Sequence, residues 1–519
     1  MKDLAKLIKS LNRVEVSALR HFYVKKTRKK VAKRLKLFNL LRKNPQANEE
    51  KISKVFFGAI HDTRLDVLKY QLIHDVLDTL LINYSSSKYK TPYLQASAEC
   101  RKLILQGDIL LKRGFLTLGL EFMEKASLKA QEFDIPLLQL QADEILFNHK
   151  LARDGESHLK DYFIKIKDSL EKARCIFLAQ EYLAEIDSQN AFHSNVRNRF
   201  CKKIYDSIGE LNTFYLLTRS PNVGYYFYYT SIVGYRLCKE YLKAKSAAEL
   251  LFALLQKEKA IYSEIRMGML LLQKSTIAIH LKEYTRAVEL SKEGISLFNK
   301  DSFNELRAME ILFEALFHAK QYGEAERLIQ AAQKHSRYNY SRFSEKKWNF
   351  YRNNLLFATR RYEEMNFDRP TIDELMKDKS GFYPGCKILE IMSFIERKEF
   401  NQIDDKLFAL EKILLRQSDI PMNKIIQNGY NPDLKRIIVI FNLLKFLINK
   451  NYNALQLKSH YDFIRTLEER NQFFNLLKNG QDDYEWNPIG YEYIRFDEWL
   501  KQKAEEQGVE EKKGMQVNG

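Results

Sequence analysis

The sequence predicts an all-α fold, a right-handed α-solenoid built from antiparallel helix hairpins. Three observations lead to this prediction. The 519 residues include only 19 Gly and 9 Pro, below ordinary usage of about 7% and 5% and too few for the frequent turns of an all-β fold. Apolar residues recur at helical spacing in nearly every segment. A short basic-polar turn followed by an aromatic residue recurs about every 38–43 residues, as expected when each repeat is one helical hairpin.

The first helices are predicted from their caps and apolar spacing. Asn12 followed by Glu15 is typical of a capping box at the start of a helix. The turn at residues 44–48 ends a basic helix, and Asn48 is expected to cap the next one. The stretch SSSKYKTP at residues 85–92 is predicted to be a linker. Residues 1–90 are therefore expected to form a basic helical region of their own.

Positive charge is concentrated at the start of the chain. Residues 1–45 hold 15 Lys and Arg against 2 acidic residues, whereas the whole chain carries a net charge of +18. On a helix, the densest part forms a basic patch of Lys25, Lys26, Lys29, Lys30, Lys33, Arg34 and Lys36. The patch is open to two main interpretations, a solvated helix face or a contact for an acidic surface such as a nucleic-acid backbone. Docking on a membrane surface is a third.

The recurring pattern joins the end of one helix to an aromatic residue that opens the next. It occurs as LCKEYLKA with Tyr241, HLKEYTRA with Tyr284 and HAKQYGEA with Tyr322, and it degrades around Tyr362 and Phe400. An alanine follows three residues after each of the first three tyrosines, at Ala244, Ala287 and Ala325. His280 and His318 recur just before the turn of two successive repeats and are interpreted as polar residues at helix ends.

This pattern resembles tetratricopeptide (TPR) repeats, which place an aromatic residue at the start of the second helix and small residues three and ten positions later. Tyr284, Ala287 and Gly294 fit this spacing, as do Ala325 and Ala332 after Tyr322. The resemblance covers about residues 99–132 and 225–415, although the period exceeds the family's 34 residues and Pro seldom closes a repeat. The stretch GYEYIRFDEWL at residues 490–500 also resembles the C-terminal ends of uncharacterised TPR-like proteins from the Bacteroidetes group of bacteria.

The expected organisation has five parts. Residues 1–90 form the basic region, 91–220 form hairpins with one TPR-like repeat, and 221–420 form further TPR-like repeats. Residues 421–500 are expected to form a helical cap, and the charged residues 501–519 a disordered tail.

The TPR resemblance implies a concave groove lined by the first helices of successive hairpins. Its expected lining residues are Tyr226, Tyr229, Leu272, Thr276, Arg307, Glu310, Glu314, Lys347, Phe350 and Asn354. Aromatic residues mixed with isolated charges favour a protein or peptide partner, so we expect a non-enzymatic interaction scaffold. The alternative is a nucleic-acid-binding or regulatory protein that uses the basic patch, with the solenoid serving regulation or dimerisation.

No motif in the sequence indicates catalysis. Phosphate-binding glycine loops, the HExxH zinc motif and the GxSxG elbow are all absent. We therefore expect no enzyme activity, cofactor or bound metal. Five widely separated cysteines, Cys100, Cys175, Cys201, Cys238 and Cys386, favour a reducing compartment with each one a small buried hydrophobe. With no signal peptide and no apolar run long enough for a membrane span, we expect a cytoplasmic protein.

Overall fold

A computed structural model describes residues 2–24, 29–82, 91–154, 159–188, 194–340, 342–367, 382–417, 432–449, 486–500 and 502–503. Within these ranges every regular element is a helix and no strand occurs, as the sequence predicts. The chain divides into two compact units, Met1–Lys90 and Thr91–Gly519. None of the described helices is both long enough and apolar enough to cross a membrane. The expected tail at 501–519 lies almost wholly outside the described residues.

The described residues of the first unit form five helices. They are α1 (Lys2–Ser10), α2 (Arg13–Val24), α3 (Lys29–Lys43), α4 (Glu49–Phe57) and α5 (Thr63–Ile82). The predicted capping box is confirmed, because the backbone N–H of Glu15 donates to Asn12 Oδ1 at 2.9 Å and that of Asn12 donates to Glu15 Oε2 at 2.8 Å. The predicted cap at Asn48 is also confirmed, since its side chain accepts from the backbone N–H of Glu50 at 2.8 Å. Leu19, Phe38 and Leu72 are fully buried in the core of this unit.

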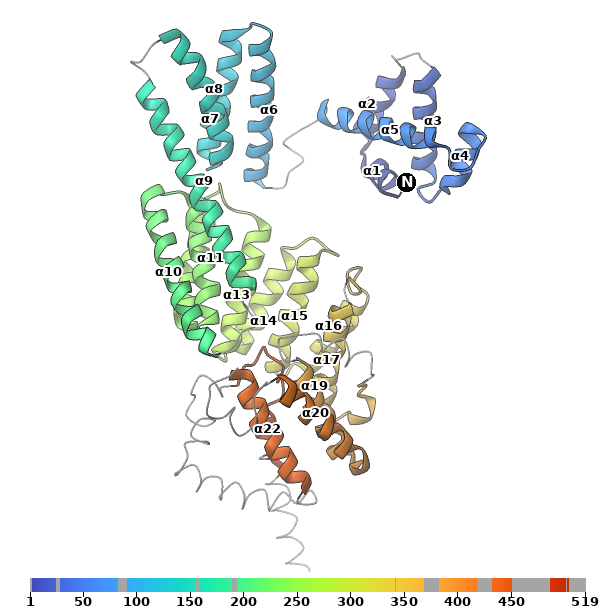
Figure 1. The fold of residues 1–519 in the computed structure, drawn as a ribbon, viewed down its shortest axis with the longest axis vertical. Coiled ribbons are helices and arrows are strands. Elements are labelled where there is room, and N and C mark those ends of the chain that lie inside the picture. Colours follow the sequence, from blue (N-terminus) through green and yellow to red (C-terminus); the bar gives the residue numbers. More distant parts are fainter. Residues whose placement is uncertain are drawn as a thin grey trace, which may run out of the picture. The chain divides into compact units, whose positions relative to one another are not determined.

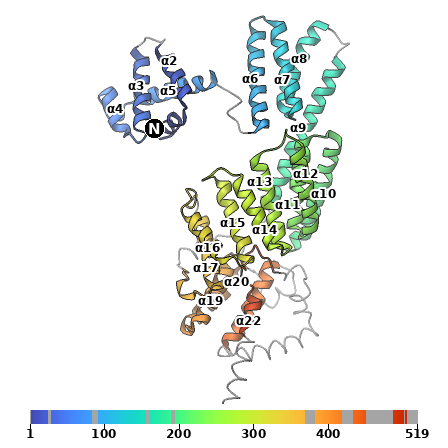
Figure 2. The same ribbon diagram turned by 180° about the vertical axis from the view of Figure 1, so that it is seen from behind.

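The second unit is a series of antiparallel helices in which each helix packs against the next (Figures 1 and 2). The helices of its first half are α6 (Pro92–Lys112), α7 (Leu116–Glu132), α8 (Pro136–Asp154), α9 (Leu159–Ser188), α10 (Ser194–Thr218), α11 (Pro221–Leu237) and α12 (Tyr241–Lys257). Those of its second half are α13 (Glu264–His280), α14 (Tyr284–Ser296), α15 (Phe303–His318), α16 (Tyr322–Gln333), α17 (Arg342–Ala358), α19 (Phe382–Arg397), α20 (Ile403–Gln417) and α22 (Pro432–Asn449). Single-turn 3₁₀ helices precede α19 and α20, η3 at Tyr362–Glu364 and η4 at Phe400–Gln402. First helices of successive hairpins also contact one another, as in α11 with α13 and α13 with α15.

The recurring pattern marks the same turn each time. The residue two before each aromatic has left-handed backbone, with φ between 58° and 61°, at Lys239, Lys282, Lys320, Arg360 and Lys398. The next backbone N–H then reaches back to a carbonyl of the preceding helix, at 2.8 Å from Glu283 to Ala278 and 2.9 Å from Gln321 to Leu316. Such hydrogen bonds satisfy carbonyls left open at a helix end. The pattern is therefore the sequence signature of a helix-ending turn.

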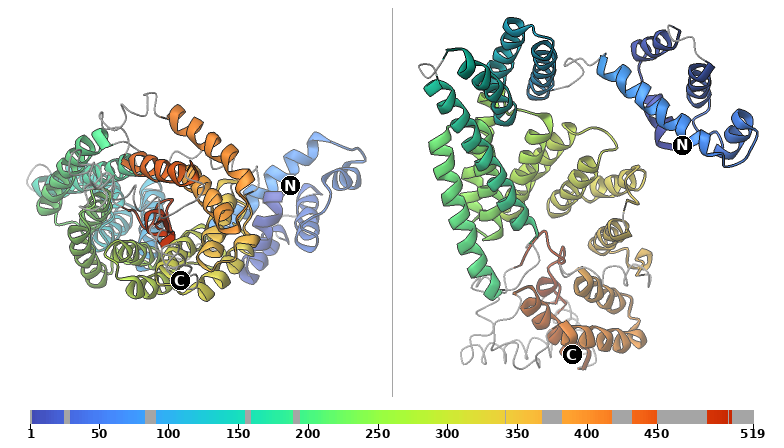
Figure 3. Two further views of the ribbon diagram at one scale, coloured as in Figure 1. Left: turned by 90° about the horizontal axis from the view of Figure 1, so that it is seen from below. Right: turned by 45° about the horizontal axis from the view of Figure 1, so that its top comes forward.

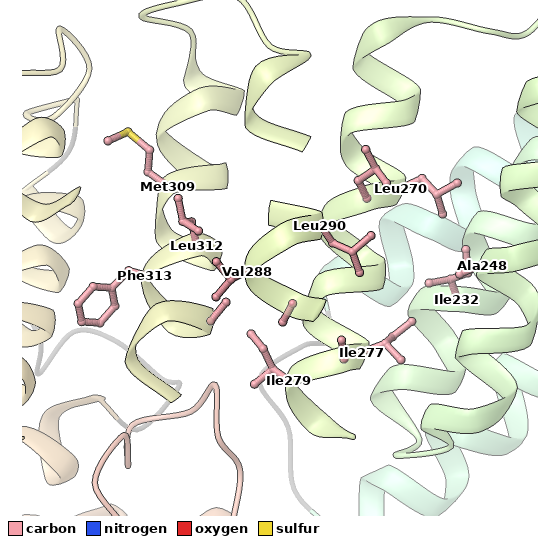
Figure 4. Packing of buried hydrophobic residues seen from close by; sticks show 14 of the residues in the cluster. Ile232, Ala248, Leu270, Ile277, Ile279, Val288, Leu290, Met309, Leu312 and Phe313 are labelled. Atoms are coloured by element: carbon pink, nitrogen blue, oxygen red, sulfur yellow. The ribbon is translucent and has the colours of Figure 1, made fainter. Parts of the chain in front are cut away.

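The small residues after each aromatic permit close helix packing. Ala244, Ala287 and Ala325 are all fully buried. A Cβ added at Gly268 of α13 would lie 3.2 Å from the Gly294 carbonyl of α14, so the two helices cross at close range. Apolar side chains from successive hairpins fill the space between the helices (Figure 4). The repeats thus share one continuous apolar core, as expected of stacked hairpins.

The expectation for the cysteines is wrong for two of the five. Cys201 of α10 and Cys238, which ends α11, form a disulfide with their Cα atoms 5.8 Å apart. Antiparallel packing of α10 on α11 brings these residues together although 37 positions separate them in the sequence. Cys100, Cys175 and Cys386 are buried thiols outside this disulfide, as predicted.

Candidate functional site

Residues 486–500, here called the C-terminal segment, lie inside the arc of helices of the second unit (Figure 3, dark red). Its first part is held to α15, where His318 Nε2 lies 2.6 Å from the Pro488 carbonyl oxygen. Burial lowers the pKa of His318 to about 4, so the ring is neutral at pH 7 and Nε2–H donates this hydrogen bond. The segment therefore returns to helices that precede it by more than a hundred residues.

Tyr493 of this segment is buried in the apolar core of the repeats, with 2% of its surface exposed. Its ring is parallel to that of His318 at an interplanar angle of 8° and a centroid distance of 5.9 Å. Rings of α15 and α17 surround it edge-on or tilted at 5.5–6.0 Å, within the range of favourable aromatic contacts. With Glu314, the surrounding residues make up what we call the Tyr493 site: Phe313, Glu314, Phe317, His318, Phe350 and Tyr351.

Glu314 gives the Tyr493 site its polar contact. Its Oε1 accepts a hydrogen bond from the Tyr493 hydroxyl at 3.0 Å and another from the Tyr351 hydroxyl at 3.4 Å. Burial raises the pKa of Glu314, and the nearby ammonium of Lys347 opposes that shift. Burial, together with this carboxylate, also raises the pKa of Tyr493 well above its usual value, so the phenol remains a donor. The surrounding residues thus contact both the ring and the hydroxyl of Tyr493.

Other residues of the segment belong to a different apolar cluster, formed with α19, α20 and α22. Tyr491, Phe496, Trp499 and Leu500 are buried in it. Between Tyr491 and Tyr493, Glu492 receives two hydrogen bonds from Arg436 of α22, at 2.6 and 2.8 Å. Both side chains are about 96–97% buried, so this is a buried, bidentate ion pair.

Gly385 of α19 allows the segment to approach closely. A Cβ at this position would lie 2.6 Å from the Tyr491 carbonyl oxygen and 2.9 Å from the Tyr491 Cβ. Real Cβ atoms do not tolerate such a distance to backbone, so only glycine fits opposite Tyr491.

Five of the predicted groove residues are placed near the C-terminal segment. Glu314 and Phe350 contact Tyr493 directly. Glu310 lies beside them and accepts a hydrogen bond from Lys347 Nζ at 2.8 Å. Asn354 is buried one turn after Phe350 and donates to the carbonyl of that residue at 2.9 Å.

Four of the other five take part in helix packing, and the fifth, Arg307, is close enough to Glu314 for its charge to act on that carboxyl group. Leu272 and Thr276 are buried, with Leu272 in a small apolar cluster between α13 and α15, so helix packing rather than an open surface occupies them. Tyr229 is also buried and accepts from Gln273 at 3.4 Å, while Tyr226, half-buried, accepts from Gln180 at 2.9 Å. Arg307 is exposed on α15.

The basic patch is only partly described. Lys25 and Lys26 lie outside the described residues, and Lys29 and Lys30 open α3.

Within the described part, Arg34 Nη1 donates to the buried Asp75 carboxylate at 2.6 Å, where the Tyr23 hydroxyl also donates at 2.8 Å. Lys33 Nζ lies 4.6 Å from the centroid of the Phe57 ring, and Lys36 is exposed. Arg34 therefore holds the helices of the first unit together instead of extending a basic surface.

The two repeat histidines have equivalent packing. His280 stacks on Tyr241 at 4.2 Å, and His318 stacks on Tyr284 at 5.7 Å, so each histidine covers the turn aromatic of the preceding repeat. Burial lowers the pKa of His280 to about 3. No group of three or more His, Cys, Asp or Glu side chains suited to a metal is found among the described residues.

Tyr493, Gly385 and Arg436 are not among the residues that the sequence patterns predict. The one available signal is the aromatic stretch at residues 490–500, which stands out only as a resemblance at the end of the chain. Nothing in a local pattern shows that this stretch returns to α15, because the contact joins residues 179 positions apart.

Comparisons with known proteins add little to this description. No family model matches the chain, and no curated protein matches it. A search of solved structures finds one described as the crystal structure of the apo form of RapI. It is 13% identical, with a TM-score of 0.37, and the match covers 73% of this chain and 98% of that one. A likeness of this size carries no argument about function.

Proposed function

We propose that the chain is a non-enzymatic interaction scaffold that binds a protein or peptide partner through the first helices of its repeats. One observation carries the proposal. The face formed by α15 and α17 already holds an irregular peptide segment, with a buried side-chain anchor at Tyr493 and a main-chain hydrogen bond at Pro488. A buried aromatic anchor combined with main-chain contacts is how many peptide-binding surfaces obtain affinity and orientation.

The TPR-like repeat pattern supports the same proposal. Repeats stacked side by side present their first helices as one extended surface, and such surfaces bind other macromolecules in many repeat proteins. Arg307 on α15 is exposed close in sequence to the predicted groove residue Glu310. A crosslinking group placed at Arg307 should therefore react with a partner that binds this surface.

The alternative, nucleic-acid binding through the basic patch, gains no support from the described residues. Arg34, the arginine of the predicted patch, is bound by Asp75 within the first unit. The alternative therefore stays a prediction of the sequence alone.

The proposal is tested by site-specific photocrosslinking in full-length protein. A photoreactive phenylalanine analogue is placed at Arg307 on α15 and, as a matched control, at the exposed Thr285 on the second helix α14. A defined protein crosslinked from position 307 but not from 285, in nuclease-treated extract, is the expected result. Equal labelling at both positions, or labelling only of nucleic acid in untreated extract, contradicts the proposal.

A further inference from the structure

We propose that Cys201 and Cys238 form a reversible oxidation site, at which thiol–disulfide exchange with a small thiol fastens or releases the start of α10. This inference goes beyond the scaffold function proposed above and does not depend on it. The disulfide joins α10 to the end of α11. The exposure of its cysteines, the charges beside them and the other contacts of α10 indicate that the bond is reversible and show what it holds.

The two bonded cysteines are more accessible than the other three of the chain. Cys201 and Cys238 are both half-buried, whereas Cys100, Cys175 and Cys386 are buried. Exchange requires an attacking thiolate to reach a sulfur of the bond, and accessible disulfides are the ones that are reduced most readily. A small thiol can therefore reach this bond without opening the core of the repeats.

Positive charge beside the bond favours the thiolate form of the cysteines. Lys202 and Lys239 each directly follow one cysteine of the pair in the chain. The carboxylate nearest to the pair in sequence, that of Glu240, is bound by Lys243 at 2.7 Å. Cations lower the pKa of a nearby thiol, and a cysteine with a lower pKa is the better leaving group in exchange. The local charge thus assists breakage of the bond by an incoming thiolate.

The proposed reaction transfers two electrons from two small thiols to the protein disulfide. The thiolate of the first molecule attacks one sulfur, forms a mixed disulfide and releases the other cysteine as a thiolate. The thiolate of the second molecule attacks the small-thiol sulfur of the mixed disulfide and releases the remaining cysteine. The two protons of the small thiols end on the cysteines, and the small thiols leave as their own disulfide. The reverse sequence oxidises the protein again.

The bond is the contact nearest to the start of α10 among those that the structure describes for this helix. The next contacts follow Cys201 along the helix. Ile204 is fully buried against Gly234 of α11, where an added Cβ would lie 2.5 Å from Ile204 Cγ2. The ring of Tyr205 lies 5.9 Å from that of Tyr235. Reduction therefore releases the start of α10 and leaves these later contacts in place.

The turn that follows Cys238 does not need the bond for its shape. Leu281 and Ala319 hold the position of Cys238 in the next two turns of the same kind, each just before a residue with left-handed backbone. The backbone N–H of Glu240 donates to the Tyr235 carbonyl at 2.8 Å, the same hydrogen bond that closes those later turns. Reduction should therefore act on α10 and leave the turn folded.

The test is a redox titration of full-length protein in mixtures of reduced and oxidised glutathione that span the poise of the cytosolic glutathione pool. After acid quenching, free thiols are alkylated in denaturant, and each cysteine is quantified by peptide mass spectrometry. We expect Cys201 and Cys238 to become alkylated together, with their midpoint inside this range, while the helical circular dichroism stays unchanged. Cys100 is the internal reference, because its thiol lies outside the bond and should be alkylated fully in every mixture.

Hydrogen exchange measures what the bond holds. In the reduced protein, the amides of residues 194–202 should exchange at least about tenfold faster than in the oxidised protein, whereas those of residues 239–241 should not change. Cys201→Ser should show the fast exchange in both redox states. Cys100→Ser is the matched control and should respond to glutathione as wild type does. The wild-type measurements decide the inference even where Cys201→Ser does not fold.

Three results would overturn the inference. A bond that stays intact in every mixture would be a permanent cross-link. A bond that is reduced only together with loss of the helical signal would be part of the folded core. Equal exchange of residues 194–202 in both redox states would show that the bond does not hold the start of α10. None of these results affects the scaffold function, because crosslinking from position 307 does not involve either cysteine.

Discussion

The hydroxyl of Tyr493 donates a 3.0 Å hydrogen bond to Glu314, a residue 179 positions earlier in the sequence. Through this contact the end of the chain becomes part of the surface formed by its central repeats. Glu310 and Phe350, predicted from the repeat pattern as groove residues, lie around the same contact. The surface with the best features for a peptide partner is thus one that the protein itself already uses to hold a peptide.

Replacing Gly385 by alanine should loosen the C-terminal segment. The new Cβ would lie 2.6 Å from the Tyr491 carbonyl oxygen, so either α19 or the segment must move. We expect a cost of about 1–3 kcal/mol, typical of overpacking, and faster hydrogen exchange at residues 486–500. Gly209→Ala in α10 is the control, because nothing lies within 4 Å of its added Cβ, and it should stabilise the helix by about 0.5–1 kcal/mol. Unchanged exchange in Gly385→Ala would contradict the close approach.

Local structure could be predicted from the sequence in both units because its causes are local. The capping box at Asn12 and Glu15 follows from spacing and side-chain chemistry within one helical turn. The turn before each of Tyr241, Tyr284 and Tyr322 recurs with the same residue types, and the structure gives it the same backbone each time.

The candidate site could be predicted only in part, because its other half comes from a distant segment. Glu310, Glu314 and Phe350 follow from repeat positions, whereas Tyr493 has no periodic relation to them. The burial of Leu272 depends on Phe298 and Ala308 packing against it, which no pattern in α13 itself reveals.

Acid should destabilise the protein through the repeat histidines. Burial lowers the pKa of His318 to about 4, compared with 6.5 when unfolded, so the unfolded chain binds the proton more tightly than the folded one. The contribution of this shift to the free energy of unfolding is fully present above pH 6.5 and is lost as the pH falls toward 4. The loss is at most about 1.4 kcal/mol per pH unit. His318→Gln retains a donor for the Pro488 carbonyl but does not titrate.

The measurement is urea unfolding of wild type and His318→Gln at several pH values between 7 and 5. The difference in the free energy of unfolding between the two proteins should narrow steadily or change sign as the pH falls. Only wild type loses the stability that comes from the lowered pKa of His318. The raised pKa of Glu314 has the opposite effect, favouring the folded state in acid, but it is common to both proteins. Parallel curves over this range would show that His318 is not buried in its neutral form.

Replacing Lys282 by glycine should stabilise the protein. Lys282 has a φ of 61° at the turn between α13 and α14, a conformation that costs non-glycine residues about 1 kcal/mol or more. Glycine removes this strain but is more flexible when unfolded, so a net gain of roughly 0.5 kcal/mol is expected. Lys282→Ala is the matched control, because it removes the same charge and retains the Cβ. Thermal melts in which alanine equals or exceeds glycine would contradict the assignment of this turn.

Breaking the ion pair of Arg436 and Glu492 should be costly. Glu492→Gln leaves the buried guanidinium with the Asp497 carboxylate at 2.8 Å, so the cost should stay below the roughly 3–5 kcal/mol of a fully broken buried pair but above about 1 kcal/mol. The control is Glu411→Gln, whose partner Lys445 is 41% exposed and whose loss should cost less than about 1 kcal/mol. Urea unfolding of the two variants measures this difference, and equal costs would show that Glu492 is solvated.

The disulfide can be tested by counting the reactive thiols of the denatured chain. With Cys201 bonded to Cys238, the denatured but unreduced chain should expose the three free thiols of Cys100, Cys175 and Cys386. Cys201→Ser should raise the count by one, because it releases Cys238, whereas Cys100→Ser should lower it by one. The same Cys201→Ser change should cost about 2–4 kcal/mol of stability, since it frees a loop in the unfolded chain. Five reactive thiols in the unreduced chain would show that the bond does not form where the protein was made, and would favour the reducing compartment that the sequence predicts.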